Sequence, residues 1–209
     1  MGGAPGTERS PQHSALPVHN ALPSTRCLAA EPVTSLSVEP LTPATFAPFG
    51  NVIEASPVGR EQAGSETINA GTSRRREAIA ALDLQREGAR AVLAVYEAAA
   101  QALPLQAREV ERHRLSDQVF LPLGAARRCV VLVAPAEGEP NDMHLRAFVS
   151  DGRQGVRIRA GTWHHGLISL DAGAWAVLER RAPDGAVDCD VRTLAPEVTL
   201  VWPARTAGR

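Results

Sequence analysis

Short apolar runs separated by Gly, Pro and Asp follow one another along most of the chain, from about Leu36 onward. This spacing of short strands and turns is typical of a β-sandwich or β-barrel. The expected strands are residues 50–55, 90–97, 105–113, 118–123, 129–134, 145–150, 156–159, 162–169, 174–181, 188–193 and 198–202. We therefore expect one mainly β domain over residues 36–204, an antiparallel β-barrel whose interior can hold a small ligand.

Two short helices and one extension complete this picture. Thr42 and Pro43 resemble a helix N-cap followed by proline in the first turn, which predicts a short helix within residues 41–49. A second short helical piece is expected over residues 76–84. Residues 1–35 are rich in Pro, Ser, Gly and Ala and show no hydrophobic periodicity, so we predict that they form a disordered N-terminal extension.

Composition narrows the class of protein. The 209 residues are 44% hydrophobic and 22% charged, as in ordinary globular proteins, and the formal net charge is −1. This balance provides no basic field for nucleic acid or for a membrane, so neither is expected as a partner. All positive charges are arginines, since the sequence has no lysine. An anion site must then use guanidinium groups, and a Schiff-base lysine is excluded.

The cysteines indicate a reducing environment. Cys27, Cys129 and Cys189 are odd in number and widely spaced, without a CxxC pair. This argues against a disulfide framework and against a zinc ribbon. The first 35 residues lack the charged start and continuous apolar stretch of a secretory signal, so we expect a cytoplasmic location.

Residues 157–166, Arg-Ile-Arg-Ala-Gly-Thr-Trp-His-His-Gly, contain the first candidate chemistry. Gly161 predicts a tight turn that leads into a strand. Successive strand residues face opposite sides, so His164 and His165 cannot both point into a barrel, and at most one is catalytic. The Gly-x-x-His spacing is similar to part of the second cupin motif, whose histidine points inward. The alternative is a pair of core or surface histidines.

Two further segments are candidates. Residues 109–123 end a strand in a charged cluster and then turn, which places His113 near Gln118 across a hairpin, although a solvated charged turn is the alternative. Residues 68–77, Ile-Asn-Ala-Gly-Thr-Ser-Arg-Arg-Arg-Glu, contain three adjacent arginines, which normally form a solvated loop. The neighbouring Asn69 indicates a more ordered turn, with one arginine directed toward an anion.

In this order, these segments resemble the ureidoglycolate lyase family. The matching pieces are residues 41–43, 46–54, 68–72, 75, 103–105, 111–113, 118–123, 145–148, 154–156 and 161–165. The resemblance covers roughly residues 38–195 and implies a cupin-like barrel that forms a homodimer. It also implies a carbon–nitrogen lyase of allantoin (purine) breakdown, which splits ureidoglycolate, a small anion, into glyoxylate and urea.

The chemistry fits the candidate residues. Ureidoglycolate is a carbinolamine with a carboxylate, and its collapse requires removal of the hydroxyl proton and protonation of the departing urea nitrogen. An imidazole with a pKa of about 6.5 can do both near neutral pH, and an arginine can hold the carboxylate. The expected catalytic residues are His164, His113 and Arg112, with His164 or His113 as the acid–base group and Arg112 or Arg75 as the residue that holds the carboxylate. The expected substrate-binding residues are Arg75, Asn69, Gln118, Trp163 and His165.

No cofactor is certain from the sequence, and two alternatives stay open. One is a metal-dependent cupin enzyme for another small carboxylate, with a divalent ion such as nickel or zinc on His113 and His164. The other is a diverged protein that binds a ureide or keto acid without catalysis. Departures from the family favour divergence: Arg76 and Glu77 replace an aromatic residue and a histidine, and Glu97 replaces an arginine. Acidic residues in the pocket would repel a carboxylate.

Overall fold

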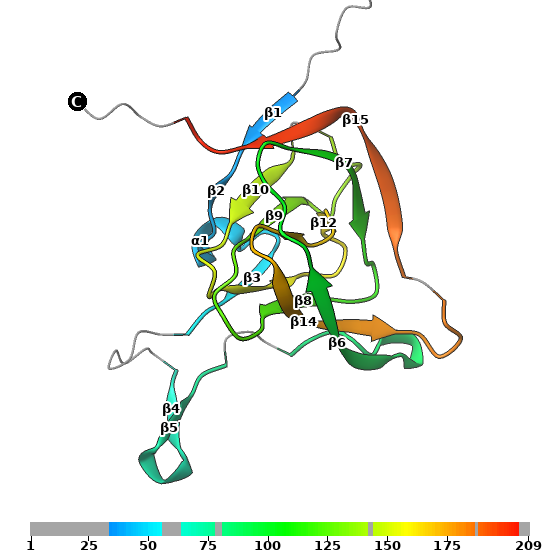
Figure 1. Ribbon diagram of the computed structural model, residues 1–209. Coiled ribbons are helices and arrows are strands. Elements are labelled where there is room, and N and C mark those ends of the chain that lie inside the picture. The colour runs from blue at the N-terminus through cyan, green and yellow to red at the C-terminus, as the bar shows by residue number, and fades with distance from the viewer. Residues whose placement is uncertain (1–33, 56–63, 78–80, 142–143, 187, 205–209) are drawn as a thin grey trace, which may run out of the picture. The chain divides into compact units, whose positions relative to one another are not determined.

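The computed structural model describes residues 34–55, 64–77, 81–141, 144–186 and 188–204 (Figure 1). The chain divides into a unit of residues 1–30 and a unit of residues 31–209, and every described residue belongs to the second unit. Most of the predicted extension therefore lies outside the described residues. The first strand begins at Thr34, one residue before the predicted end of that extension.

The described part of the chain is mainly β. Its strands are β1 (Thr34–Ser37), β2 (Glu39–Pro40), β3 (Gly50–Ile53), β4 (Glu66–Ile68), β5 (Ser73–Arg75), β6 (Arg90–Ala98), β7 (Leu105–Arg112), β8 (Gln118–Pro122), β9 (Cys129–Ala134), β10 (Arg146–Val149), β11 (Gly155–Ile158), β12 (Trp163–His164), β13 (Ile168–Ser169), β14 (Gly173–Arg181) and β15 (Asp190–Val201). The helices are α1 (Pro43–Phe46) and two single 3₁₀ turns, η1 (Asn69–Gly71) and η2 (Arg86–Gly88).

Two sheets enclose a common interior (Figure 1). The larger sheet has the order β1-β15-β7-β12-β9-β10-β2, with β13 also paired to β9, and the second has the order β3-β11-β8-β14-β6. A separate hairpin consists of β4 and β5. The predicted mainly β, barrel-like fold with few helices is confirmed. It is not wholly antiparallel, because β1 pairs with β15 and β2 pairs with β10 in parallel.

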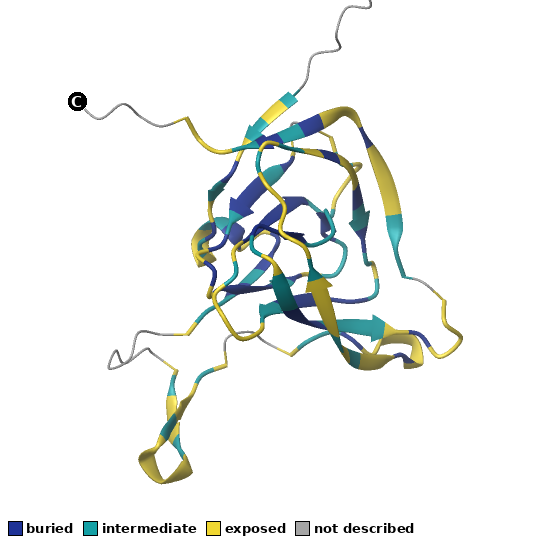
Figure 2. Ribbon diagram, in the orientation of Figure 1, coloured by how far each residue is buried: buried dark blue, intermediate teal, exposed yellow. Residues whose placement is uncertain are grey.

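β9 divides the interior into two cores, because all six of its residues are buried (Figure 2). Side chains alternate between the faces of a strand. Residues 129, 131 and 133 therefore face a core shared by the two sheets, in which Phe46, Phe49 and Phe148 pack with Trp175. Residues 130, 132 and 134 face a second core built around Trp163. The functional side chains described below lie at the edge of the first core.

Several predicted elements are confirmed. The strand over residues 129–134 has the predicted bounds. Thr42 caps α1, since its side-chain oxygen accepts a hydrogen bond from the Thr45 backbone N–H at 3.2 Å. Gly161 has a φ of 86°, as the predicted tight turn requires. No helix in the described ranges is long and apolar enough to span a membrane.

Other predictions were wrong in detail. The expected strand over residues 162–169 is two short strands, β12 and β13, and the two expected at the C-terminus are joined in β15 across a register shift. In the described part of residues 76–84 there is no helix. The predicted hairpin between β7 and β8 does not form either, because these strands belong to different sheets.

Candidate active site

Strand alternation determines which side chains of β7 and β12 face the five-stranded sheet. Trp163 packs in the second core, so its neighbour His164 points the other way, toward the space between the sheets. His164 pairs with Glu111 on β7, and directly paired residues of neighbouring strands share a face. His113 lies two residues beyond Glu111 and therefore follows on the same side. Gln118 begins β8, in the other sheet.

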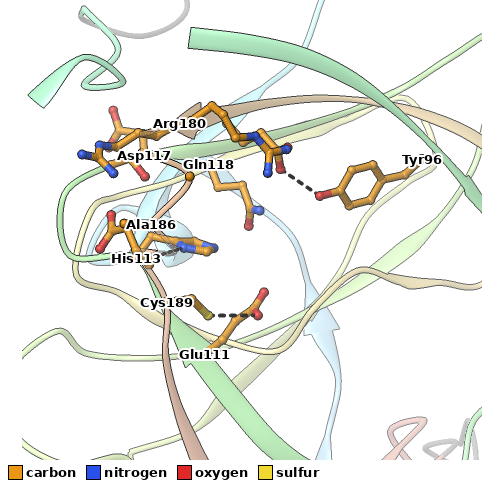
Figure 3. Close-up of a pocket in the computed structure, with 13 residues that line it drawn as sticks. Tyr96, Glu111, His113, Asp117, Gln118, Arg180, Ala186 and Cys189 are labelled. Atoms are coloured by element: carbon orange, nitrogen blue, oxygen red, sulfur yellow. Dashed lines mark hydrogen bonds and ion pairs between the residues drawn. The ribbon is translucent and has the colours of Figure 1, made fainter. Parts of the chain in front are cut away.

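Glu111, His113 and Gln118 line a cavity of about 250 Å³ between the two sheets (Figure 3). Pockets for drug-sized ligands usually measure roughly 300–1,000 Å³, so this one suits a smaller molecule. Most of its lining residues are of polar or charged types, and the lining consists of Tyr96, Glu111, His113, Ser116, Asp117, Gln118, Glu179, Arg180, Arg181, Gly185, Ala186, Asp188 and Cys189. Of the predicted site residues, His113 and Gln118 line it, and the buried His164 contacts two of the lining residues, Gln118 and Glu111.

His164 is buried, with 1% of its surface exposed. Its Nδ1–H donates to the Thr162 carbonyl oxygen at 2.9 Å, which leaves a lone pair on Nε2. Burial is the main reason that its pKa is lowered to about 4, and the nearby His113 lowers it further, whereas the Thr162 bond acts in the opposite direction. His164 is therefore a neutral acceptor near pH 7.

His113 adopts the same tautomer. Its Nδ1–H donates to the backbone carbonyl oxygen of Asp188, because a carbonyl can only accept. Its Nε2 is buried and has no hydrogen-bond partner in the described part of the chain. The two imidazole rings lie 5.4 Å apart between centroids. Both histidines thus direct an Nε2 lone pair toward the same small volume.

Glu111 completes this group. One of its carboxylate oxygens lies 3.6 Å from His164 Nε2, and the other accepts a hydrogen bond from the Cys189 thiol at 3.6 Å. Burial and Glu111 raise the Cys189 pKa to about 11, so this thiol stays protonated. Glu111 was absent from the predicted site residues. Its i, i+2 spacing from His113 on a strand was the sequence signal that could have identified it.

The convergence of acceptors favours a positive charge. Ligand atoms of Glu111, His113 and His164 all lie within 4.8 Å of one another, somewhat wider than the roughly 3.3 Å separation expected around a tetrahedral zinc with bonds of about 2.0–2.1 Å, so the side chains would close in on a bound ion. Gln118 Oε1 lies 3.1 Å from His164 Nε2, and two facing acceptors repel. A proton, a cation or a half-turn of the amide that presents its NH₂ group relieves this contact. Glu111, His113 and His164 could together hold a divalent ion.

The rest of the lining includes several charged residues. Asp117 is 1% exposed and forms an ion pair with Arg157 at 2.8 Å. At the opposite side of the cavity, Glu179 accepts a hydrogen bond from the Tyr96 hydroxyl at 2.8 Å and one from Arg181 at 2.7 Å. Burial and the Glu179 carboxylate raise the Tyr96 pKa to about 12, so the phenol remains a donor.

Three predicted site residues lie elsewhere. Arg112 follows Glu111 on β7 and therefore points to the opposite face, where it stacks 4.1 Å from the centre of the Trp163 ring and donates to Asp190 at 2.9 Å. Trp163 is fully buried in the second core. His165 is half-buried and bonds to the Gly166 carbonyl oxygen. None of the three lines the cavity, so we assign them no role in it.

Asn69 and Arg75 lie on the hairpin of β4 and β5, which does not line this cavity either. Asn69 is exposed and its side-chain amide donates to the Ser73 hydroxyl at 3.4 Å. Arg75 is 59% exposed at the side chain and pairs with Glu77 at 2.9 Å. Their expected role in substrate binding remains a prediction.

The departures from the family pattern also fall outside the cavity. Glu97 is exposed on β6, next to Tyr96, which lines the cavity, so strand alternation directs Glu97 outward. Glu77 is 73% exposed at the side chain. Arg76 donates to the Glu54 carbonyl oxygen at 2.7 Å. Glu97 therefore does not face the cavity, and the expected repulsion between its side chain and a carboxylate bound there does not arise.

The sequence is similar to known proteins over most of the described part of the chain. A family model described as ureidoglycolate lyase matches residues 33–201. The chain is 41% identical over 151 residues to a ureidoglycolate lyase of Burkholderia mallei (strain NCTC 10229), covering 72% of this chain and 85% of that protein. It is 38% identical over 148 residues to a ureidoglycolate lyase of Azotobacter vinelandii (strain DJ / ATCC BAA-1303), covering 69% and 84%, respectively. The ureidoglycolate lyase 1 of Rhizobium meliloti (strain 1021) is 39% identical over 149 residues, covering 71% and 84%.

Proposed function

This chain belongs to the ureidoglycolate lyase family, and from this premise we propose that it splits ureidoglycolate into glyoxylate and urea in the cavity between its two sheets. The observation that carries the proposal is His113 Nε2, a buried acceptor without a partner among the described residues, at a cavity of small-metabolite size. Cleavage of ureidoglycolate requires a group that removes the hydroxyl proton and protonates the urea nitrogen, and an imidazole can do both.

In this reaction His113 moves one proton. Its Nε2 takes the proton of the substrate hydroxyl, and the carbon–oxygen double bond of glyoxylate forms as the carbon–nitrogen bond breaks. The proton then passes from Nε2 to the departing urea nitrogen, so the histidine ends in its initial state. The bond from Nδ1–H to the Asp188 carbonyl keeps Nε2 directed at the cavity and stabilises the transient imidazolium.

His164 and Gln118 orient the ureido group. Because its pKa is lowered to about 4, His164 is a poor proton carrier near pH 7 but a good neutral acceptor. With its NH₂ group turned to His164 Nε2, Gln118 exposes its carbonyl oxygen to the ureido N–H groups. This arrangement distinguishes a ureido group from a hydrocarbon of the same size.

The test is the release of glyoxylate and urea from racemic ureidoglycolate by the purified protein. We expect one glyoxylate for each urea, at a rate above that of spontaneous decay. His113→Gln should lower kcat by about 10²- to 10⁴-fold, as for other lost acid–base groups. His144→Gln, a change at an exposed histidine outside the cavity, is the matched control and should have no effect. Folded wild-type protein that releases no glyoxylate above the spontaneous rate would overturn the proposal.

A second candidate is a metal-dependent form of the same site. The convergence of Glu111, His113 and His164 favours it, since three protein ligands and one open position are typical of catalytic zinc sites. A bound nickel or zinc ion would act as a Lewis acid on the substrate oxygens. In that case His113 would hold the ion through Nε2 and would no longer be free to take the proton.

Elemental analysis of the purified protein separates the two forms. About one equivalent of nickel or zinc, lost in Glu111→Gln, would support the ion. A content below about a tenth of an equivalent, with activity retained in chelator, would leave His113 as the proton carrier.

We also propose that two copies of the chain associate through the outer face of the five-stranded sheet. Leu93 and Val95 lie on its edge strand β6 and are 68% and 62% exposed. They pair with Leu178 and Ala176 on β14, which continues an apolar face across neighbouring strands.

Light scattering tests this association. The wild-type protein should have the mass of a dimer, and Val95→Glu should have that of a monomer, because it places a charge in the apolar face. Val191→Glu, a change at a 49% exposed valine on β15, is the matched control and should stay dimeric. A monomeric wild-type protein would contradict the proposal.

A further inference from the structure

We infer that Arg181 binds the carboxylate of the substrate, an inference that rests on the proposed function and names a residue outside the predicted site. Arg181 is the last residue of β14 and lines the cavity. Its side chain is 55% exposed, so the guanidinium can meet a ligand that enters from solvent.

The guanidinium already holds one carboxylate. Arg181 Nη2 donates to one oxygen of Glu179 at 2.7 Å, and the Tyr96 hydroxyl donates to the other oxygen at 2.8 Å. Glu179 therefore stays attached to the wall of the cavity by two donors. A guanidinium has five N–H groups, and in the described part of the chain Glu179 is the only side chain that Arg181 bonds. The remaining N–H groups can accommodate a second carboxylate in the two-pronged geometry that arginine favours.

The other arginines near the cavity already bond to or stack on protein groups. Arg180 has a 4% exposed side chain and donates to the Arg86 carbonyl oxygen at 3.1 Å. Arg157 is paired with Asp117 and Asn51. Arg112 lies on the opposite face of β7, against Trp163. Of the two arginines that line the cavity, Arg181 is thus the one whose guanidinium is open to solvent, with a 55% exposed side chain against 4% for Arg180.

The charge of the cavity makes this donor important. Four carboxylates line the cavity, those of Glu111, Asp117, Glu179 and Asp188, against the two guanidiniums of Arg180 and Arg181. An anionic substrate enters such a cavity only if a cation compensates for its own charge. A carboxylate bound at Arg181 would lie on the side of the cavity formed by β14 and β6, with the rest of the molecule directed toward His113.

Paired substrates test this role. Hydroxymethylurea is a carbinolamine like ureidoglycolate, but it has hydrogen in place of the carboxylate. Arg181→Met should lower kcat/KM for ureidoglycolate by about 10- to 100-fold, mainly through KM, as expected for a lost hydrogen bond to a charged group. The same change should alter kcat/KM for hydroxymethylurea by less than about twofold, since that molecule has no carboxylate to lose. Arg181→Lys keeps the positive charge but lacks the two-pronged guanidinium. Its kcat/KM for ureidoglycolate should lie between those of the wild type and Arg181→Met.

Arg108→Met is the matched control, because Arg108 is a 69% exposed arginine on β7 that pairs with Glu197 outside the cavity. It should leave both substrates unaffected. An equal loss for both substrates in Arg181→Met, or no loss for ureidoglycolate, would overturn the inference.

Calorimetry with glyoxylate separates this inference from the proposed function. The wild-type protein and Arg108→Met should bind glyoxylate with equal affinity, and Arg181→Met at least about 10-fold more weakly. If the wild-type protein does not cleave ureidoglycolate but binds glyoxylate through Arg181, the proposed function fails and the carboxylate site stands. If cleavage occurs and Arg181→Met binds glyoxylate as tightly as the wild type, the carboxylate site fails and the proposed function stands.

Discussion

Removal of the Asp117 side chain should destabilise the protein more than any change at an exposed ion pair. Asp117 immediately precedes β8 and lines the cavity. Its carboxylate accepts hydrogen bonds from Arg157 Nη2 at 2.8 and 3.0 Å and from the backbone N–H groups of Asp83 and Ala160 at 2.9 and 3.1 Å. It therefore joins β11, the segment before β6 and the turn before β12.

The magnitude follows from what Asp117→Ala leaves behind. The Arg157 side chain is 13% exposed, and its Nε already has no partner in the described part of the chain. Without Asp117, Nη2 also loses its acceptor, so a buried charge remains uncompensated. Breaking such a pair typically costs about 3–5 kcal/mol. Glu197→Ala breaks the exposed pair with Arg108 and should cost less than about 1 kcal/mol.

Urea denaturation followed by circular dichroism measures the difference. With a slope of about 2 kcal/mol per molar urea, Asp117→Ala should lower the midpoint by about 1.5–2.5 M. The double variant with Arg157→Met should recover part of that loss, because it removes the unpaired charge. A shift below about 0.5 M in Asp117→Ala, or no recovery in the double variant, would refute this account of the pair.

Two further predictions concern stability. Gly50→Ala should lower the free energy of unfolding by several kcal/mol or prevent folding, because a Cβ there would lie 1.9 Å from the Arg157 carbonyl oxygen. Gly166→Ala is the control and should be nearly neutral, because a Cβ at that position would have no atom within 4 Å. Thermal unfolding measures both. For His164, a folded pKa of about 4 lies below the unfolded value of about 6.5, so the unfolded chain binds more protons between these pH values. The free energy of unfolding should therefore fall by up to about 3 kcal/mol as the pH drops from 6.5 to 4 in chelator, and His164→Gln should flatten that slope; equal slopes would contradict it.

The elements that the sequence predicted best depend on local chemistry. β9 was predicted with its observed bounds because it is a continuous apolar run between Arg128 and Pro135. Thr42 was recognised as a helix cap because a side-chain oxygen before a proline satisfies the first turn by itself. In contrast, the pairing of β7 with β15 and of β8 with β11 depends on contacts between distant segments, which no local pattern encodes.

The same distinction holds for the site. His113, His164 and Gln118 were expected to act together, and the structure places His113 and Gln118 at one cavity with His164 in contact with both. Arg112 was expected at the site, but it follows Glu111 on β7, and strand alternation directs it to the opposite face, against Trp163. Arg181 could not have been identified, since its place at the cavity follows from the pairing of β14 between β8 and β6.

A crystal structure of the protein with glyoxylate bound tests the central claim most directly. The account predicts that the ligand occupies the cavity between the two sheets, with its carboxylate on Arg181 and its carbonyl carbon facing His113 Nε2. Glyoxylate bound at Arg75 on the hairpin, or on an outer face with this cavity empty, would contradict it.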